Sequence, residues 1–328
     1  MVLNFEFERL EAELKVRNPK KVLVQLPEGV KQDVTMIQEK IENLGIEVVF
    51  SGETAWGGCC VNSDEARNVE ADLIVHFGHA KYSDVDFPVL YIEVKDDVKL
   101  DSLLEKSLES LNDYKKIGLS FSIQHKDEID SVRKFYERNG KEILMSEKVG
   151  HAVVLGHVIG CEFSGLKTIQ ENVDAFVVIG NNFHSMGAAL SVDKPVFLLD
   201  VYNEDVKEMR DLRDKILRQR IISISKFKDV KNVGVIIESK FGQKFGDANL
   251  LIDGLKEDGK VPHLITMSEI TPDKIMNFYN LDAFVVLACP RIPIDDFAKY
   301  EKPMITFREA LVVVGKKSMD DLLEEGIL

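Results

Sequence analysis

Cysteine is scarce in this sequence, with four residues in 328, two of them adjacent as Cys59 and Cys60. So few thiols in so long a chain do not form a disulfide framework, and a reducing cytosol would keep them as thiols. Long hydrophobic runs are also missing, since no apolar stretch approaches the roughly 18 to 20 residues that cross a bilayer. The N-terminal segment alternates charged and apolar residues, unlike a secretory signal. We therefore expect a cytoplasmic protein with no membrane partner.

Positive charge is in deficit, because 42 Lys and Arg face 56 Asp and Glu, giving a net charge of −14. A nucleic-acid partner is therefore not expected, since binding to phosphates needs a basic field. Hydrophobic residues make up 45% of the chain and charged residues 30%, as in ordinary globular proteins. A chain of 328 residues is long for a single core, so we expect two or three domains.

The chain contains three similar segments, each opening with a short β-rich run at residues 20–26, 115–121 and 231–237. A helix-period stretch and a second strand follow in each copy. A third strand then begins near an aspartate (Asp72, Asp174, Asp282), and these aspartates are 102 and 108 residues apart. The fourth strand follows a proline, and these prolines are spaced by 107 and 108 residues: Pro88, Pro195 and Pro303.

The strand segments are nearly continuous Val, Ile, Leu and Phe, which is typical of parallel strands buried on both faces. Helices are expected at 30–44, 127–139 and 247–258. We predict three similar α/β domains, each with a roughly four-stranded parallel sheet flanked by helices, arranged with pseudo-threefold symmetry. Their boundaries are 1–112, 113–228 and 229–328. The alternative is one large doubly wound domain. A longer helix with a solvated charged face is expected at 203–220, by its apolar spacing.

Each copy places one cysteine near the carboxyl edge of its sheet, where open α/β sheets bind ligands. Cys59 and Cys161 follow the second strands of their copies, and Cys289 directly follows a third strand. Three thiols meeting on a shared axis could hold a metal group, and thiolates select zinc, copper(I) or iron–sulfur clusters. Structural zinc takes four ligands in close pairs, and no C-x₂-C is present. The alternative is three buried thiols, and the residues alone do not choose between Cys59 and Cys60.

Five stretches of the chain carry a resemblance to a known family: WGGC (56–59), VHFGH (75–79), LGHVIGCEFS (155–164), GNNFHSMG (180–187) and ACPRIPIDD (288–296). With the three-copy layout, they resemble the archaeal diphthamide synthase family from about residue 20 onward. One departure is that the residue after the first cysteine, commonly aspartate in the family, is Cys60 here.

The resemblance implies a [4Fe-4S] cluster held by Cys59, Cys161 and Cys289, with S-adenosylmethionine bound at the open iron. It implies cleavage between sulfur and the γ-carbon of the methionine part, giving a 3-amino-3-carboxypropyl radical and methylthioadenosine. The radical adds to an imidazole carbon of one histidine in translation elongation factor two. It also implies a homodimer, and the chemistry needs an electron donor.

Several polar residues near the predicted strand ends are candidates for binding S-adenosylmethionine. His79, beside His76, could form a polar wall of the site for S-adenosylmethionine or the incoming histidine. The alternative is that a histidine at a strand end is simply hydrogen-bonded to the backbone. Gly180 and His184 lie in a loop that could approach the nucleoside or be an ordinary turn. Arg291 could pair with the carboxylate; the alternative is a surface salt bridge to Asp295 or Asp296. Gln243 lies in a glycine-flanked segment without a full phosphate-binding pattern.

Three other functions compete with this expectation. A quinolinate synthase-like dehydratase would also use a three-cysteine cluster, as a Lewis acid without S-adenosylmethionine. A non-catalytic iron–sulfur or electron-transfer subunit is a second alternative, although four ligands are usual there. The third is a three-domain small-molecule binding protein with buried cysteines.

Overall fold

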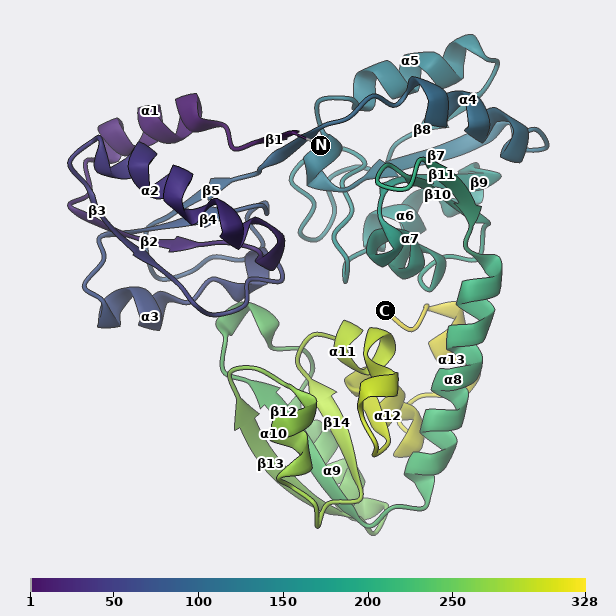
Figure 1. Cartoon of the computed structure of the whole chain (residues 1–328). Coiled ribbons are helices and arrows are strands. Elements are labelled where there is room, and N and C mark those ends of the chain that lie inside the picture. Colours follow the sequence, from purple (N-terminus) through teal and green to yellow (C-terminus); the bar gives the residue numbers. More distant parts are fainter. Residues whose placement is uncertain (1) are drawn as a thin grey trace. The chain divides into compact units, whose positions relative to one another are not determined.

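The computed structural model, drawn in Figure 1, describes residues 2–328. By their internal contacts these residues divide into two compact units. The first unit comprises the residues up to 101 together with 121–132 and 240–242. The second comprises 102–120, 133–239 and 243–328. Parallel strands flanked by helices make up both units, so the predicted α/β class is confirmed.

The first unit contains a parallel sheet with the strand order β3-β2-β4-β5. Its strands are β2 (Lys21–Gln25), β3 (Glu47–Phe50), β4 (Leu73–Phe77) and β5 (Val89–Ile92). A short antiparallel pair, β1 (Val2–Asn4) with β6 (Lys95–Asp97), extends beside it. The buried side chains of β2 and β4 share a core with two i,i+4 helix pairs: Leu10 with Leu14, and Ile37 with Ile41.

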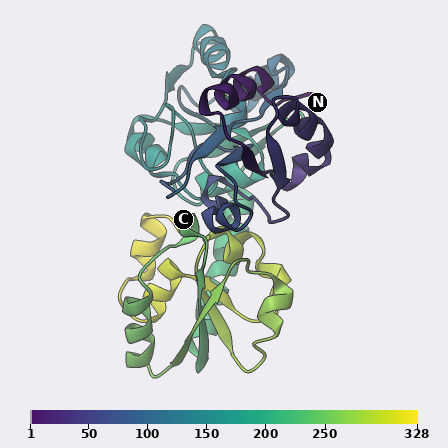
Figure 2. The same cartoon turned by 90° about the vertical axis from the view of Figure 1, so that its left-hand side faces the viewer.

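The second unit contains two sheets. The strand order of the first is β11-β10-β9-β7-β8, from β7 (Lys116–Phe121), β8 (Glu142–Leu144), β9 (Ala175–Gly180), β10 (Val196–Asp200) and β11 (Asp205–Glu208). The order of the other is β13-β12-β14-β15, from β12 (Asn232–Glu238), β13 (Val261–Met267), β14 (Ala283–Leu287) and β15 (Met304–Thr306). Figure 2 shows helices on either side of the latter sheet.

The α-helices connect these strands in the alternating order that parallel pairing requires. They are α1 (Phe7–Arg17), α2 (Val34–Glu42), α3 (Ser63–Asn68), α4 (Asp101–Ser110), α5 (Ile129–Arg138), α6 (Ser164–Ile169), α7 (Asn182–Ala189), α8 (Arg210–Lys228), α9 (Ala248–Glu257), α10 (Pro272–Met276), α11 (Arg291–Asp295), α12 (Phe307–Val313) and α13 (Met319–Glu324). Short 3₁₀ turns are η1 (Glu28–Asp33), η2 (Gly58–Cys60), η3 (Ile123–His125), η4 (Gln170–Asn172), η5 (Phe241–Gln243) and η6 (Phe297–Lys299).

The repeated aspartates have the same hydrogen bonds in all three sheets. One carboxylate oxygen accepts from two successive backbone N–H groups where the first strand of the copy begins. The donors are Lys20 and Lys21 for Asp72, Lys115 and Lys116 for Asp174, and Lys231 and Asn232 for Asp282, at 2.7 to 3.2 Å. These bonds lower the pKa of each carboxyl group. The aspartate therefore recurs because it fastens the first strand to the third.

The repeated prolines also share one role. The carbonyl group of each proline accepts a hydrogen bond from the third strand, at 2.8 to 3.0 Å, and the fourth strand then begins at the next residue. Proline lacks a backbone donor, so the first position of a strand suits it. The three separate sheets exclude one continuous doubly wound sheet. The predicted boundaries at 112/113 and 228/229 and the pseudo-threefold symmetry remain predictions.

The long helix differs from its prediction at 203–220. Residues Asp205–Glu208 form β11, which pairs antiparallel with β10, and α8 begins only at Arg210 and runs to Lys228. The reason is a tight turn: the Asp200 carboxylate accepts from the backbone N–H groups of Tyr202 and Asn203 at 3.2 and 3.1 Å. The charged face of α8 is also not wholly exposed to solvent, because Arg220 is buried.

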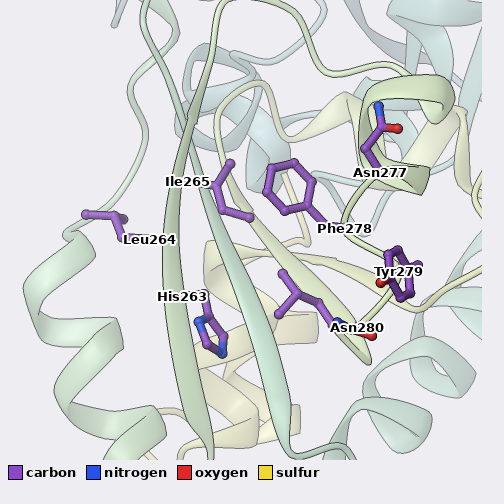
Figure 3. A pocket seen from close by; sticks show the side chains of 8 residues that line it. His263, Leu264, Ile265, Asn277, Phe278, Tyr279 and Asn280 are labelled. Carbon is purple, nitrogen blue, oxygen red and sulfur yellow. The ribbon is translucent and has the colours of Figure 1, made fainter.

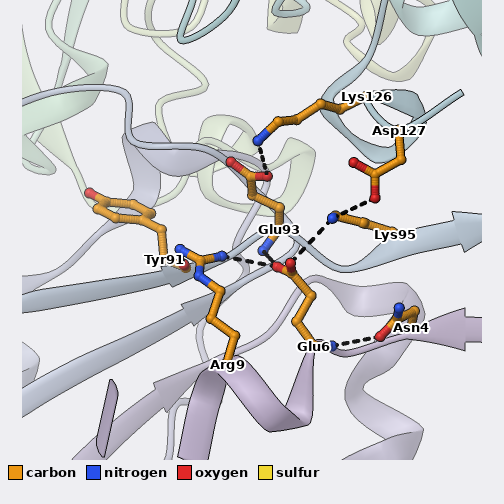
Figure 4. Close-up of polar contacts among 8 residues, drawn as sticks. All are labelled: Asn4, Glu6, Arg9, Tyr91, Glu93, Lys95, Lys126 and Asp127. Carbon is orange, nitrogen blue, oxygen red and sulfur yellow. Dashed lines mark hydrogen bonds and ion pairs between the residues drawn. The ribbon is translucent and has the colours of Figure 1, made fainter. Parts of the chain in front are cut away.

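Charged side chains fasten residues 121–132 within the first unit (Figure 4). Lys95 on β6 contacts Asp127 at 2.6 Å and Glu6 at 3.3 Å, and Lys126 contacts Glu93 at 3.4 Å. These partly exposed pairs form a network, which contributes more than isolated surface pairs do. The segment they hold carries Gln124, whose side-chain amide donates to the Gly78 carbonyl at 2.7 Å, next to His79.

None of the helices within residues 2–328 combines the length and the apolar character that spanning a membrane would require.

Candidate functional site

Cys59 lies in η2, between two other segments of the first unit. A Cβ atom on Gly58 would be 2.2 Å from the Ala80 carbonyl oxygen, and one on Gly242 would be 2.8 Å from the Cys59 Cα. Glycine is therefore required at both positions, because only backbone fits in the remaining space. At both glycines the close approach is to backbone atoms of the same chain.

The two adjacent thiols are not equivalent. Cys60 is 2% exposed, whereas Cys59 is partly exposed. A hydrogen bond with the Cys59 side chain lowers the pKa of Cys60 to about 7, burial opposes this, and the charge of Lys240 assists it. The two thiols lie within hydrogen-bonding distance of each other in the 3₁₀ turn η2. These contacts favour the thiolate form of Cys60.

Alanine at position 242 is expected to disturb the Cys59 loop. The new Cβ would lie 2.5 Å from the Cys59 carbonyl oxygen, and overpacking of this kind costs about 1 to 3 kcal/mol. Urea denaturation of G242A measures the loss, and alkylation of Cys59 should become faster. The matched control is G29A, where nothing lies within 4 Å of the added Cβ and little change is expected. Equal stability and equal Cys59 reactivity in the two variants would contradict the packing argument.

His76 and His79 form a linked pair at the carboxyl end of β4. His76 is fully buried; its Nδ1 lies 3.2 Å from Gln25 Oε1 and its Nε2 lies 3.0 Å from His79 Nδ1. One ring nitrogen of the close pair must donate and the other accept, so both rings cannot be charged. Burial lowers the pKa of His76 well below 6.5 and that of His79 to about 4. The two imidazoles are thus neutral at physiological pH. His79 also has a hydrogen bond with the Phe77 backbone, as expected for a histidine at a strand end.

Stability is expected to fall as the pH is lowered from 6.5 towards 4. In this window the unfolded chain binds protons that the folded His76 and His79 do not, so protonation favours unfolding. The shift of His79 alone corresponds to a loss of about 3 kcal/mol. Chemical denaturation of the protein at several pH values measures this slope.

The pH slope should shrink in H76Q/H79Q, because glutamine does not titrate. A residual slope is expected from His125, which is buried and whose pKa burial also lowers. A stability that stays constant between pH 6.5 and 4 in the parent protein would show that these imidazoles titrate normally.

In the second unit, Cys161 and Cys289 lie in two segments that Arg291 joins. Arg291 donates from Nη1 to the Gly160 carbonyl at 2.6 Å and to the Phe183 carbonyl at 2.8 Å. It also forms a bidentate pair with Asp295, at 2.9 and 3.1 Å. The alternative of a salt bridge to Asp295 is therefore realised, although it is buried rather than at the surface. Binding of a ligand carboxylate by Arg291 stays a prediction.

The other predicted residues also lie at strand ends. Gly180 ends β9, and the next residue, Asn181, caps α7 by accepting from the N–H groups of Phe183 and His184. His184 Nδ1 lies 3.0 Å from the same Asn181 oxygen, so its ring orientation is fixed. Gln243 is buried in η5, after the carboxyl end of β12. The segment at 180–187 is thus the capped start of a helix rather than an ordinary turn. Its approach to the nucleoside stays a prediction.

The sequence analysis did not identify two residues that act on the predicted strand-end site, one on the Cys60 thiol and one on the His76 ring. Lys240 acts on the Cys60 thiol and Gln25 orients His76. Lys240 comes two residues after β12, so the rule that placed the cysteines at carboxyl edges could have found it. Gln25 is the last residue of β2 and could have been found in the same way.

A pocket of about 330 Å³ lies elsewhere in the second unit, between β13 and the segment before β14 (Figure 3). Its lining includes Leu264, Phe278 and Tyr279. This is the amino end of β14, whereas Cys289 follows its carboxyl end. None of the predicted site residues lines this pocket.

The predicted ligands belong to different units: Cys59 to the first, and Cys161 and Cys289 to the second. Within residues 2–328, neither unit by itself groups three His, Cys, Asp or Glu side chains as a metal site. A shared three-thiol site stays a prediction.

Comparison with known proteins identifies relatives along nearly the whole chain. The sequence profile of the family described as "Putative diphthamide synthesis protein" matches residues 26–323. The 2-(3-amino-3-carboxypropyl)histidine synthase of Pyrococcus horikoshii is 30% identical, covering 92% of this chain and 88% of that protein. Subunit 1 of the Kluyveromyces lactis enzyme of the same name is 28% identical, covering 96% of this chain and 76% of that subunit.

Solved structures agree with the sequence matches. Dph2 from Pyrococcus horikoshii, crystallised also with a 4Fe-4S cluster, superposes with a TM-score of 0.89 at 27% identity. The superposition covers 97% of this chain and 93% of that one. The chain therefore belongs to the diphthamide synthesis protein family.

Proposed function

We propose that this chain catalyses the first step of diphthamide formation. It transfers the 3-amino-3-carboxypropyl group of S-adenosylmethionine to a histidine of translation elongation factor two. The observation that carries the proposal is the full-length likeness to Dph2, a solved relative that carries a 4Fe-4S cluster. The name of the Pyrococcus relative, 2-(3-amino-3-carboxypropyl)histidine synthase, supports the reaction.

Cys59, Cys161 and Cys289 would hold the [4Fe-4S] cluster, and the side chains around them fit such a group. All three are partly exposed, so an added group would have access to each of them. Cys59 lies beside Cys60, whose pKa is lowered to about 7, chiefly by a hydrogen bond with Cys59, and Lys240 adds positive charge to this loop. When bound, the cluster would supply the electron that breaks the bond between sulfur and the γ-carbon.

The chain's own residues would bind the substrate without opposing its charge. S-adenosylmethionine carries a sulfonium cation, which a protonated histidine would repel. His79 is held neutral by burial beside His76, so it offers a polar wall with no positive charge. His184, oriented by Asn181, would form a polar wall in the second unit, with Gly180 and Gln243 contacting the nucleoside or amino-acid part.

The remaining partners follow from the same proposal. The chain acts in the cytoplasm as a homodimer, takes electrons from a separate donor, and has no nucleic-acid partner. Its net charge of −14 supports the last point. Light scattering after gel filtration tests the dimer, for which twice the monomer mass of 37.1 kDa is expected.

The reaction is tested by anaerobic purification, reconstitution with iron and sulfide, and reduction with dithionite. S-adenosylmethionine is then supplied with and without elongation factor two. Methylthioadenosine, together with modified factor, is the expected result. 5′-Deoxyadenosine would indicate cleavage of the other carbon–sulfur bond. A cluster with neither product would favour a quinolinate synthase-like dehydratase or an electron-transfer subunit.

A further inference from the structure

Arg291 makes an unusual set of contacts for a residue two positions after a predicted cluster ligand. Its side chain is 3% exposed. The bidentate pair with Asp295, one helical turn further along α11, holds the plane of the guanidinium group. Nη1 is thereby directed away from α11, towards the carbonyl groups of Gly160 and Phe183.

The guanidinium group is closely packed. The Phe183 ring stacks on it, with the guanidinium carbon 3.9 Å from the ring centroid. A Cβ atom on Gly160 would be 1.7 Å from the Phe183 ring, and one on Gly187 would be 2.5 Å from Arg291 Nη1. Two glycines from different segments therefore make room for this one contact.

These contacts lead directly to two thiols and one imidazole. Gly160 precedes Cys161, and Phe183 precedes His184. Cys289 is tied to α11, because its carbonyl group accepts from the Ile292 N–H at 3.2 Å. One buried side chain thus joins the backbone segments of Cys161, Cys289 and His184.

We propose that Arg291 is a positioning residue that fixes the separation between the Cys161 and Cys289 thiols. The inference rests on the proposed function only in assuming that these thiols bind a cluster. The fixed separation between the thiols is expected in the protein without any cluster. Lysine cannot replace arginine in this role, because an ammonium group lacks the planar fork that binds Asp295 and two carbonyl groups at once.

The test measures the distance between the thiols in the protein without cluster. In a C59A/C60A background only Cys161 and Cys289 remain, because the chain has four cysteines. Both are labelled with a nitroxide, and their dipolar coupling is measured by electron paramagnetic resonance. A single narrow distance distribution is expected with Arg291, and a distribution at least about twofold broader with R291K.

The control is K141M in the same background. Lys141 also bridges two backbone carbonyl groups of the second unit, those of Leu111 and Tyr114, at 2.5 and 2.8 Å. Its removal should leave the distribution unchanged. Where R291K does not fold, the neutral pair R291Q/D295N serves as the test, since it leaves no buried charge unpaired. A distribution as narrow as that of the parent in a folded Arg291 variant overturns the proposal, even if the variant is less stable.

A second readout uses the reconstituted protein with all four cysteines. Residues that orient metal ligands typically change metal affinity about 10- to 100-fold when replaced. R291K is therefore expected to lose iron to a chelator about tenfold faster than K141M does; equal rates contradict the proposal. If the parent holds a cluster but yields no methylthioadenosine, the proposed function fails while the positioning role of Arg291 stands.

Discussion

Alanine in place of Cys59, Cys161 or Cys289 is expected to abolish both the visible absorbance of the reconstituted cluster and methylthioadenosine formation. Each replacement leaves two thiol ligands, too few for a four-iron cluster with one open corner. C60A should keep the cluster, because Cys60 is the buried thiol of the adjacent pair and Cys59 the partly exposed one. Iron and sulfide content, absorbance and product formation measure the four variants side by side.

The comparison between C59A and C60A decides the ligand in the first unit. The two thiols are hydrogen-bonded to each other, so C60S is the matched control that keeps a hydroxyl group near Cys59. A cluster that survives in C59A but not in C60A would assign the ligand to Cys60. Equal losses in the two variants would defeat the assignment of either residue alone.

Breaking the ion pair between Arg220 and Glu309 is expected to cost about 3 to 5 kcal/mol of folding free energy. The pair is buried, with exposures of 2% and 0%, and both of its N–O contacts are 2.7 Å. Arg220 also donates to the carbonyl groups of Pro293 and Met304. R220M leaves an unpaired carboxylate and E309Q an unpaired guanidinium group, and a buried unpaired charge is costly in either case.

The double variant R220M/E309Q completes the cycle. Because it removes both charges, it should be destabilised by much less than the sum of the single variants. Glu309 also accepts from the Thr306 N–H in the capping box of α12, so part of its loss is local to that helix. Urea denaturation followed by circular dichroism measures all three. Single variants within about 1 kcal/mol of the parent would contradict this account.

The sequence predicted the strands well because their signal is local. Runs of β-branched and apolar residues recur after fixed landmarks, and each predicted first strand lies within a residue or two of β2, β7 or β12. The start of α8 was missed because the turn at Asp200 and the pairing of β11 with β10 prevail over helical spacing. The spacing of apolar residues indicates a helix, but it does not indicate a turn such as the one that the Asp200 carboxylate stabilises.

The sequence predicted which residues of the candidate site lie at strand ends, but it did not predict most of the contacts between them. The rule that ligands gather at carboxyl edges placed the cysteines, His79 and His184. It could not show that Arg291 reaches Gly160, 131 residues away, or that Arg220 reaches Glu309, 89 residues away. An arginine close to aspartates in the sequence is readily interpreted as part of a surface salt bridge, because sequence spacing does not indicate whether the side chains are buried.

Because of the three aspartate contacts, the two ends of each sheet have different roles. Strand alignment is set at the amino end, where Asp72, Asp174 and Asp282 hold the first and third strands together. Loops at the other end can then vary freely. The cysteines follow their preceding strands at unequal intervals, namely nine residues after β3, seventeen after β8 and two after β14. A duplicated scaffold could thus diversify its reactive loops while every copy kept the same framework.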